Sequence, residues 1–487
     1  MNVINPRPYE MLIGDRWSTG STGSTFDTLN PATAQLLAQV CEAGEADVDA
    51  AVRSAHEAYE KHWRRTTPAE RGRLLRRLAA LFERDREKLA WIETLNVGKP
   101  ITHSLDSLKS MPSSLEYFAG IIPAARGETI PVGNADVLNF TIREPLGVCV
   151  LIMPWNYPMT LTINKLGPAL AAGNTVILKP SEVTPLSTMA LARLFEEAGF
   201  PPGVVNVVNG PGATVGEWLV KHPLVSRVSF TGGTVTGARI LASTASDIKH
   251  VTLELGGKSP LIVFDDAPLD KAVAVAAGDI IKNSGQVCIA CTRLLVQDSI
   301  REEFLEKLCR RLDTIRFGSP SEPATEMGPL VSAAQKQRVE RYLDIAEREG
   351  AKLVQFGREE LNDATSAGFF VKPTLLLDST ARMQSAQDEI FGPVQSVIAF
   401  SDEEQALRIA NDSRYGLAAV LFTRDGGRAL RMARGIQSGS VAINTGMRTS
   451  FDAPFGGYKQ SGIGKERGLE AICENMQIKN VKYDMSV

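Results

Sequence analysis

The 487-residue sequence has few cysteines, and it lacks both long apolar runs and an excess of positive charge. Six irregularly spaced cysteines are too few for a disulfide framework, and they fit a reducing compartment. No run of about 18 apolar residues occurs, and the N-terminus lacks the charged and apolar regions of a signal peptide. We therefore expect a cytoplasmic protein with no membrane partner.

The charge balance and the histidine count argue against a nucleic-acid-binding protein and against a zinc protein. The 53 Lys and Arg nearly balance the 56 Asp and Glu, which indicates neither a nucleic-acid footprint nor a polybasic surface. A zinc site would need a second ligand pair beside Cys288 and Cys291, and the five histidines are scattered. We expect no metal, and a small molecule as the partner.

The hydrophobic pattern predicts two α/β units. Residues 46–61 and 68–95 have the apolar spacing of covering helices. From residue 147, short β-rich runs alternate with helical segments in two successive series, which is typical of mainly parallel sheets wrapped by helices. Residues 125–145 and 476–487 have the pattern of exposed strands, which often pair with another subunit.

The segment GQVCIACTR (285–293) carries Cys288 and Cys291 at C-x-x-C spacing. It follows a helical run rather than a first strand, which disfavours a thioredoxin-like pair. Taken alone, the two residues are most simply buried apolar side chains. If the segment turns helically after Cys288, a reversible disulfide between the two stays open.

Two other segments place reactive groups where predicted strands end. In LELGGKSP (253–260), Glu254 precedes two glycines, where backbone can approach a ligand closely. In MPWNYP (153–158), Asn156 lies between two prolines. A cysteine, a carboxylate and an amide at such strand ends indicate acyl-transfer chemistry. The ordinary alternatives are a cap or ion pair for Glu254 and a turn for Asn156.

A dinucleotide site is indicated more weakly. SFTGGTVTG (229–237) is a strand-to-helix turn whose backbone N–H groups could meet a pyrophosphate, although it is not G-x-G-x-x-G. In KPSE (179–182), Lys179 and Glu182 suit ribose hydroxyls.

Over nearly its whole length the chain resembles the aldehyde dehydrogenase superfamily, in its non-acylating, NAD(P)-dependent form. Seven segments in the family's order carry the resemblance: PWNYP (154–158), KPSE (179–182), FTGGTVTG (230–237), LELGGKSP (253–260), GQVC (285–288), EIFGPV (389–394) and PFGGYKQSGIGKERG (454–468). The implied α/β fold has a Rossmann-like NAD(P)-binding domain (1–124 and 146–256), a catalytic domain (257–473) and a β-hairpin oligomerisation arm (125–145 and 474–487). The implied assembly is a homodimer or homotetramer.

The resemblance also implies roles for single residues. Cys288 matches the nucleophile, Glu254 the general base, and Asn156 the amide that holds the oxyanion with the Cys288 N–H. Lys165 matches a lysine associated with the active site. The implied cofactor-binding residues are Trp155, Lys179, Ser181, Glu182, Gly212, Thr231, Gly232, Gly233, Gly237, Leu255, Glu389 and Phe391. The implied substrate-tunnel residues are Tyr157, Thr160, Leu161, Asn164, Lys282, Ile289 and Phe455.

The implied reaction is oxidation of an aldehyde to a carboxylic acid through a thioester on Cys288, which water activated by Glu254 hydrolyses. Glu182 favours NAD, because a carboxylate accepts a hydrogen bond from a ribose 2'-OH and repels a 2'-phosphate, with NADP still possible. Two segments depart from the family's pattern. Gly233 replaces the serine of FTGS, and GKERG (464–468) replaces GRELG, a change that we expect to matter little.

The substrate is the least determined feature. Positions 164 and 282 are aromatic in several relatives that act on apolar or choline-like aldehydes, and arginines in the succinate-semialdehyde branch. Lys282 therefore favours an acidic semialdehyde such as succinate semialdehyde, against a solvated lysine at a helix end. Aliphatic, hydroxy- and aromatic aldehydes stay open. Glu254 disfavours a CoA-acylating enzyme, and the three reactive residues together disfavour a non-catalytic scaffold.

Overall fold

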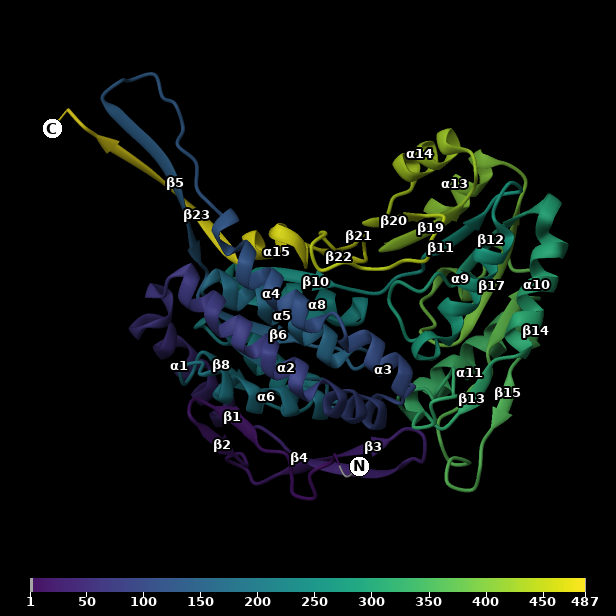
Figure 1. Ribbon diagram of the computed structural model, residues 1–487, viewed down its shortest axis with the longest axis horizontal. Coiled ribbons are helices and arrows are strands. Elements are labelled where there is room, and N and C mark those ends of the chain that lie inside the picture. The colour runs from purple at the N-terminus through teal and green to yellow at the C-terminus, as the bar shows by residue number, and fades with distance from the viewer. Residues whose placement is uncertain (1–2, 487) are drawn as a thin grey trace.

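Two sheets, each covered by helices, make up most of residues 3–486, which the computed structural model describes (Figure 1). The first sheet has the order β2-β1-β8-β7-β6-β9-β10-β22, and its five central strands are parallel. Its strands are β1 (Met11–Ile13), β2 (Arg16–Ser18), β6 (Val148–Ile152), β7 (Thr175–Lys179), β8 (Val205–Val207), β9 (Val225–Thr231), β10 (His250–Glu254) and β22 (Gly462–Ile463).

Alternate residues of the central strands pack on opposite faces of this sheet. In β6, Cys149 and Leu151 join one apolar cluster, whereas Val148 and Val150 join another. Because both faces are buried, these strands are nearly continuous apolar runs, as parallel strands usually are. The covering helices are α1 (Glu45–Lys61), α2 (Pro68–Val97), α3 (Ile101–Leu108), α4 (Met111–Ile121), α5 (Pro158–Ala172), α6 (Leu186–Ala198), α7 (Glu217–Lys221) and α8 (Thr234–Thr244).

The longest helix, α2, begins and ends where its sequence specifies. Thr67 accepts a hydrogen bond from the Glu70 N–H, and the Glu70 carboxylate accepts one from the Thr67 N–H at 2.7 Å, which forms a capping box. Pro68 occupies the first turn, and Gly98 ends the helix with a φ of 87°.

The second sheet has the order β14-β16-β17-β12-β11-β19-β20, and only β14 runs antiparallel to its neighbour. Its strands are β11 (Pro260–Val263), β12 (Arg293–Gln297), β14 (Lys352–Gln355), β16 (Thr374–Leu377), β17 (Val394–Phe400), β19 (Ala418–Phe422) and β20 (Ser440–Ile443). The accompanying helices are α9 (Leu269–Ile281), α10 (Arg301–Asp313), α11 (Ala333–Arg348), α12 (Gln384–Gln387), α13 (Glu403–Asn411) and α14 (Gly426–Gly435). The last helix, α15 (Gly468–Glu474), packs instead against α5 of the first unit. Two short pairs, β13 (Arg316–Gly318) with β15 (Arg358–Glu360) and β18 (Tyr415–Gly416) with β21 (Tyr458–Lys459), complete this half.

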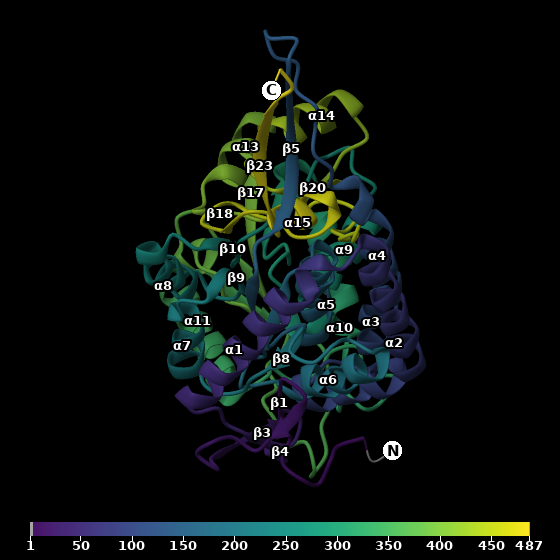
Figure 2. The same cartoon turned by 90° about the vertical axis from the view of Figure 1, so that its left-hand side faces the viewer.

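A two-stranded arm projects from the first unit (Figures 1 and 2). It consists of β5 (Val137–Pro145) and β23 (Met476–Asp484), paired antiparallel along their whole length. Large apolar side chains on the arm are exposed, among them Leu138, Ile142 and Ile478. An exposed apolar ribbon of this kind is a surface that another chain can cover.

The first 41 residues form more structure than the sequence predicts. They contain the β1–β2 hairpin and the pair β3 (Thr25–Asn30) and β4 (Gln35–Cys41). The hairpin escaped prediction because three-residue strands are too short to show a period.

Segment 462–463, assigned from sequence to the catalytic domain, pairs with β10 of the first sheet. Among residues 3–486, none of the helices has the length and apolar character needed to cross a bilayer.

Candidate active site

Three predicted site residues lie where neighbouring parallel strands of the first sheet end. Lys179 ends β7, Thr231 ends β9 and Glu254 ends β10, while Asn156 follows β6. Because these strands are adjacent and parallel, their carboxyl ends meet at one edge of the sheet. Cys288 comes from the second unit, in the loop between α9 and β12. The candidate site therefore lies where the two units meet.

The loop that carries Cys288 has an unusual backbone. Asn283, Ser284 and Gly285 have φ values of 46°, 56° and 72°, and a side chain at Gly285 would lie 2.1 Å from the Gly392 carbonyl oxygen. Three successive left-handed residues are costly, so surrounding contacts must hold them. The Ser284 hydroxyl donates to the Gly328 carbonyl at 2.7 Å, and the Gln286 Oε1 accepts from the Val331 N–H at 2.9 Å.

Asn156 is tied directly to this loop. Its side-chain amide donates to the Gln286 carbonyl at 3.0 Å, and the Asn283 amide donates to the Asn156 carbonyl at the same distance. Only one of the two Asn156 N–H groups is used in this bond, and the side chain is buried. The second N–H has no partner among residues 3–486, so it can donate to a bound ligand next to the cysteine loop.

The half-buried Cys288 thiol is held in its protonated form. Burial raises its pKa to about 12, with a further contribution from the nearby Glu389 and Glu254 carboxyls, and the Arg467 guanidinium opposes the rise. A thiol with such a pKa is uncharged at neutral pH and needs a base before it can act as a nucleophile.

Glu254 is a buried carboxyl without a partner. Its side chain is 4% exposed, and neither carboxyl oxygen has a hydrogen bond within the described chain. Burial, followed by the neighbouring Glu466, raises the Glu254 pKa well above its usual range, while Lys165 lowers it. A carboxyl with a raised pKa beside a nucleophile is suited to accept a proton near neutral pH.

Lys165, whose charge lowers the Glu254 pKa, is itself buried in an ion pair with Glu466. Its Nζ also donates to the Ser229 hydroxyl at 3.0 Å, and that hydroxyl donates to Glu466 at 3.3 Å. The charge of Lys165 is therefore balanced inside the fold. Sequence reasoning did not single out Glu466.

The residues predicted to contact the cofactor's adenosine ribose lie together. The Lys179 Nζ is 3.4 Å from the Glu182 carboxylate, whose other oxygen accepts from the Gly212 N–H at 3.3 Å. The Ser181 hydroxyl accepts a hydrogen bond from the Val183 N–H at 3.3 Å, so it caps the turn that presents Glu182.

The turn between β9 and α8 has the close packing that a phosphate site needs. A side chain on Gly232 would lie 2.4 Å from the Phe230 ring, and one on Gly237 would lie 2.6 Å from the Leu255 side chain. Gly233 is open, with no atom within 4 Å of an added side chain. The Thr231 hydroxyl is buried without a hydrogen bond in the described chain. Together with the free N–H groups that begin α8, it can face an anion.

The residues predicted for the nicotinamide end also converge. The Glu389 carboxyl accepts from the Gly257 N–H at 3.0 Å, and burial raises its pKa to about 7. The Trp155 and Phe391 rings lie edge to face with centroids 5.1 Å apart. A cavity of about 650 Å³ joins Trp155 and Val183 to the start of α11. These features fit a dinucleotide bound across the junction of the two units.

Residues 17–481 match the sequence pattern of the aldehyde dehydrogenase family. The chain belongs to this family. An aldehyde dehydrogenase from Emericella nidulans is 43% identical over 478 residues, which cover 98% of this chain and 95% of that protein. A crystal structure of betaine aldehyde dehydrogenase from Staphylococcus aureus in complex with NAD+ has a TM-score of 0.97 at 37% identity. It covers all of this chain and 97% of that one. The predicted family, α/β fold class and enzyme class are confirmed.

The predicted substrate residues lie around the start of α5 and near Cys288. Tyr157, Thr160, Leu161 and Asn164 belong to or precede α5, and the Thr160 hydroxyl and Asn164 amide nitrogen are buried without partners in the described chain. The Lys99 Nζ lies 4.1 Å from the centre of the Tyr157 ring. Ile289, next to Cys288, is half-buried.

Lys282 differs from the other predicted substrate residues because it is exposed. It caps the C-terminal end of α9, where a cation is favoured whether or not a ligand is present. Phe455, by contrast, is buried, and the Arg467 guanidinium lies 5.3 Å from the centre of its ring. Arg467 belongs to segment 464–468, which departs from the family's pattern, so this departure lies over a predicted substrate residue.

Cys291 packs in the core of the second unit, away from solvent. Its N–H donates to the Asp279 carboxyl at 3.2 Å. The chain after Cys288 makes a turn and enters β12, so the helical turn on which the disulfide hypothesis depends does not form.

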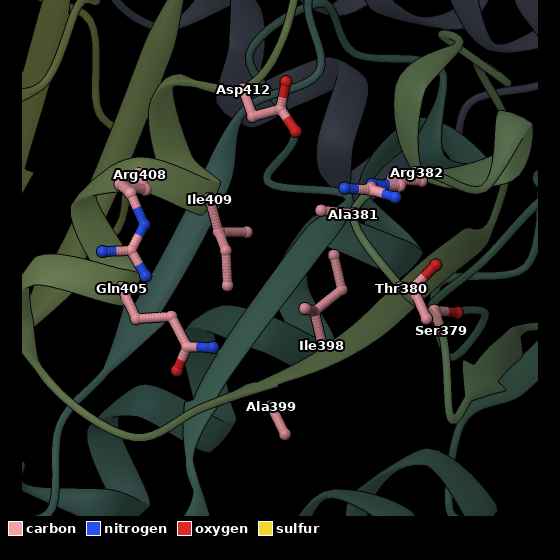
Figure 3. A pocket seen from close by; sticks show the side chains of 10 residues that line it. All are labelled: Ser379, Thr380, Ala381, Arg382, Ile398, Ala399, Gln405, Arg408, Ile409 and Asp412. Atoms are coloured by element: carbon pink, nitrogen blue, oxygen red, sulfur yellow. The ribbon is translucent and has the colours of Figure 1, made fainter.

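A larger surface hollow of about 770 Å³ lies elsewhere, between β17, α13 and the loop after β16 (Figure 3). It is lined by Ser379, Thr380, Ala381, Arg382, Ile398, Ala399, Gln405, Arg408, Ile409 and Asp412, and contains none of the predicted site residues.

Sequence reasoning missed several residues that hold the site together. Gln286 is the second residue of the GQVC motif, and its buried amide fixes the loop from both sides through Asn283 and Val331. On α11, Gln335 donates to the Phe391 carbonyl at 2.7 Å and Arg338 to that of Ile390 at 3.3 Å. Its position between Gly285 and Cys288 in the GQVC motif was the available signal for Gln286. Nothing in the sequence pairs α11 with residues 389–391.

Proposed function

We propose that this protein oxidises an aldehyde to a carboxylic acid, with NAD as the electron acceptor, through a thioester on Cys288. The observation that carries this proposal is the meeting of three groups from separate elements. The Cys288 loop is held by the Asn156 amide, and the unpaired Glu254 carboxyl lies close enough to raise the Cys288 pKa. Nucleophile, oxyanion donor and base are the parts that acyl transfer requires.

The reaction begins with proton transfer from Cys288. The thiol proton passes to solvent, and the Arg467 guanidinium, which lowers the Cys288 pKa, favours the thiolate that remains. The thiolate then attacks the aldehyde carbon. The free N–H of Asn156 and the Cys288 backbone N–H stabilise the oxyanion that forms.

NAD, when bound, accepts a hydride from the tetrahedral carbon and leaves a thioester. Lys179 and Glu182 would hold the adenosine ribose. Thr231, Gly232 and the first N–H groups of α8 would hold the pyrophosphate, and Glu389 and Phe391 the nicotinamide end. The Staphylococcus aureus structure in complex with NAD+ supports this choice of cofactor.

Hydrolysis of the thioester completes the reaction. Glu254 accepts a proton from a water molecule that attacks the thioester carbon, and Cys288 leaves as the thiol. The balance is aldehyde, NAD+ and water giving carboxylic acid, NADH and a proton. The presence of Glu254, which can activate water, favours water over CoA as the acceptor.

For the substrate we propose an acidic semialdehyde, of which succinate semialdehyde is an example. The Staphylococcus aureus relative is described as acting on betaine aldehyde, which carries a positive trimethylammonium group. Lys282 is one of the predicted substrate residues, and the Arg467 guanidinium lies over another, Phe455; both cations would repel such a group. We also propose a homodimer or homotetramer, since the arm exposes apolar side chains, and we retain the domain boundaries expected from sequence.

The proposal is tested by incubating the purified protein with a panel of neutral, anionic and cationic aldehydes and NAD or NADP, with and without CoA. We expect nicotinamide reduction with the free carboxylic acid as product, unaffected by CoA. Cys288→Ser should abolish turnover while circular dichroism and the melting temperature stay unchanged. Absence of turnover with every aldehyde, or formation of an acyl-CoA product, would contradict the proposal.

A further inference from the structure

Arg467 is a buried arginine whose side chain makes no ion pair or hydrogen bond with the described residues. Arg467 as a whole residue is 8% exposed, and its Nε is buried and makes no hydrogen bond among residues 3–486. Its backbone adopts a φ of 66°, which is unfavourable for a residue with a side chain. The fold thus holds a strained residue and a desolvated cation at one position.

Such a cation needs an anion. Burying an unpaired charge is expensive, and buried arginines are normally paired with carboxylates. Burial lowers the Arg467 pKa, and the acidic side chains of Glu466 and Glu254 lie close enough to raise it, but neither forms an ion pair with its guanidinium. Glu466 is bound to Lys165, and Glu254 makes no ion pair with any residue of the described chain.

The position of Arg467 is fixed beside the predicted catalytic residues. Phe455 and Glu466 exchange two backbone hydrogen bonds of 2.7 Å, which brings Arg467 over the Phe455 ring. The next residue, Gly456, lies against Glu254: an added side chain there would come within 2.9 Å of Oε1. Arg467 is also close enough for its charge to lower the Cys288 pKa.

We infer that the Arg467 guanidinium binds a carboxylate at the far end of the substrate and so places the aldehyde carbon at Cys288. This inference rests on the proposed function, and it gives the substrate class as short aldehydes that end in a carboxylate. A guanidinium can bind a carboxylate through two parallel hydrogen bonds, which fixes the ligand's orientation as well as its charge. The Phe455 ring beneath it offers an apolar wall for the methylene groups between the two ends.

Arg467, rather than Lys282, is the residue that selects the anionic group. Lys282 is exposed, so water screens its charge and its contribution to binding is small. Arg467 is desolvated, where a charge-assisted hydrogen bond is strong and an unpaired cation is costly. A substrate carboxylate would satisfy that cation, whereas a neutral or cationic aldehyde would leave it unpaired.

The test compares Arg467→Leu with the parent on succinate semialdehyde and on butanal, a neutral aldehyde of the same chain length. Arg434→Leu serves as the control, because it removes one exposed arginine from α14, far from the predicted site in sequence and fold. We expect the ratio of kcat/KM for succinate semialdehyde to kcat/KM for butanal to fall about ten- to hundredfold in Arg467→Leu, chiefly through KM for succinate semialdehyde. Loss of the charge that lowers the Cys288 pKa should slow both aldehydes, and this common effect cancels in the ratio. Arg467→Lys should recover part of the loss, since it keeps the charge without the two-pronged geometry.

A binding measurement separates this inference from the proposed function. Succinate, which has no aldehyde, should slow iodoacetamide alkylation of Cys288 in the parent and lose that effect in Arg467→Leu. If no aldehyde is turned over but succinate protects through Arg467, the proposed function fails and the anion site stands. If butanal is oxidised and Arg467→Leu slows both aldehydes equally, or leaves succinate semialdehyde unaffected, Arg467 is not the anchor and the inference is overturned.

Discussion

Glu182 should decide between the two nicotinamide cofactors, and replacing it by glutamine tests this. One carboxylate oxygen accepts from the Gly212 N–H and the other faces Lys179, so the side chain has a fixed place at the predicted ribose. NAD presents a 2'-hydroxyl there, which can donate to the carboxylate. NADP presents a phosphate of about −1.5 to −2 charges, which the carboxylate repels.

The size of the repulsion follows from the exposure of Glu182. Two unit charges 4 Å apart interact with about 1 kcal/mol in water and about 4 kcal/mol at an effective dielectric constant of 20. The Glu182 side chain is 42% exposed and lies beside Lys179, so the lower part of this range applies. Removing about 1–2 kcal/mol of repulsion should lower the ratio of kcat/KM with NAD to kcat/KM with NADP by roughly five- to thirtyfold.

The assay is kcat/KM for each cofactor at a fixed aldehyde concentration, together with the Kd of each by fluorescence titration. The parent should prefer NAD, and Glu182→Gln should lower the NAD to NADP ratio by the stated factor, less at high salt. Glu404→Gln, which removes an exposed carboxylate of α13, controls for net charge. An unchanged ratio in Glu182→Gln, or an equal shift in Glu404→Gln, would refute the reasoning.

Three further predictions concern the same site. Asn156→Ala should lower kcat about a hundredfold or more with little change in KM, as loss of one oxyanion donor does in steady-state assays. Gly237→Ala should lower the free energy of unfolding, measured in urea, by about 1–3 kcal/mol and weaken NAD binding, because the added methyl group would lie 2.6 Å from the Leu255 side chain. The control Gly278→Ala on α9 has open space around the added group and should not lower the stability. Burial raises the Glu254 pKa, so the folded state holds this proton more tightly, and the carboxyl's contribution to stability is lost as pH rises through the raised pKa. Glu254→Gln should therefore melt at a higher temperature than the parent at pH 8 but not at pH 5, and a difference independent of pH would contradict this assignment.

The parallel sheets could be predicted from sequence because their strands are buried on both faces. Continuous apolar runs such as 148–152 and 175–179 carry that signal, and the residues that follow them necessarily lie at one edge of the sheet. The hairpin at residues 11–18 could not be predicted, because three residues are too few to show alternation.

The candidate site shows a similar limit. Glu254 and Asn156 were found because they follow strands, whereas Arg467 follows a two-residue strand and was dismissed as a harmless change of motif. The role that we infer for it rests on burial over Phe455, which depends on the pairing of residues 455 and 466. The exposure of Lys282 could not be predicted either, since a position next to the cysteine loop in sequence need not be buried with it in the fold.

The central claim is that Cys288 carries the acyl group and Glu254 directs its hydrolysis. The most direct test is to mix Glu254→Gln with NAD and an aldehyde that the parent enzyme oxidises. The reaction is quenched with acid within one turnover, and the mass of each cysteine-containing peptide is measured. We expect one NADH per subunit to form rapidly, and the peptide with Cys288 to gain the mass of the acyl group as the carboxylic acid appears slowly. An unmodified Cys288 peptide, an acyl group on Cys291, or release of acid at the parental rate would contradict the account.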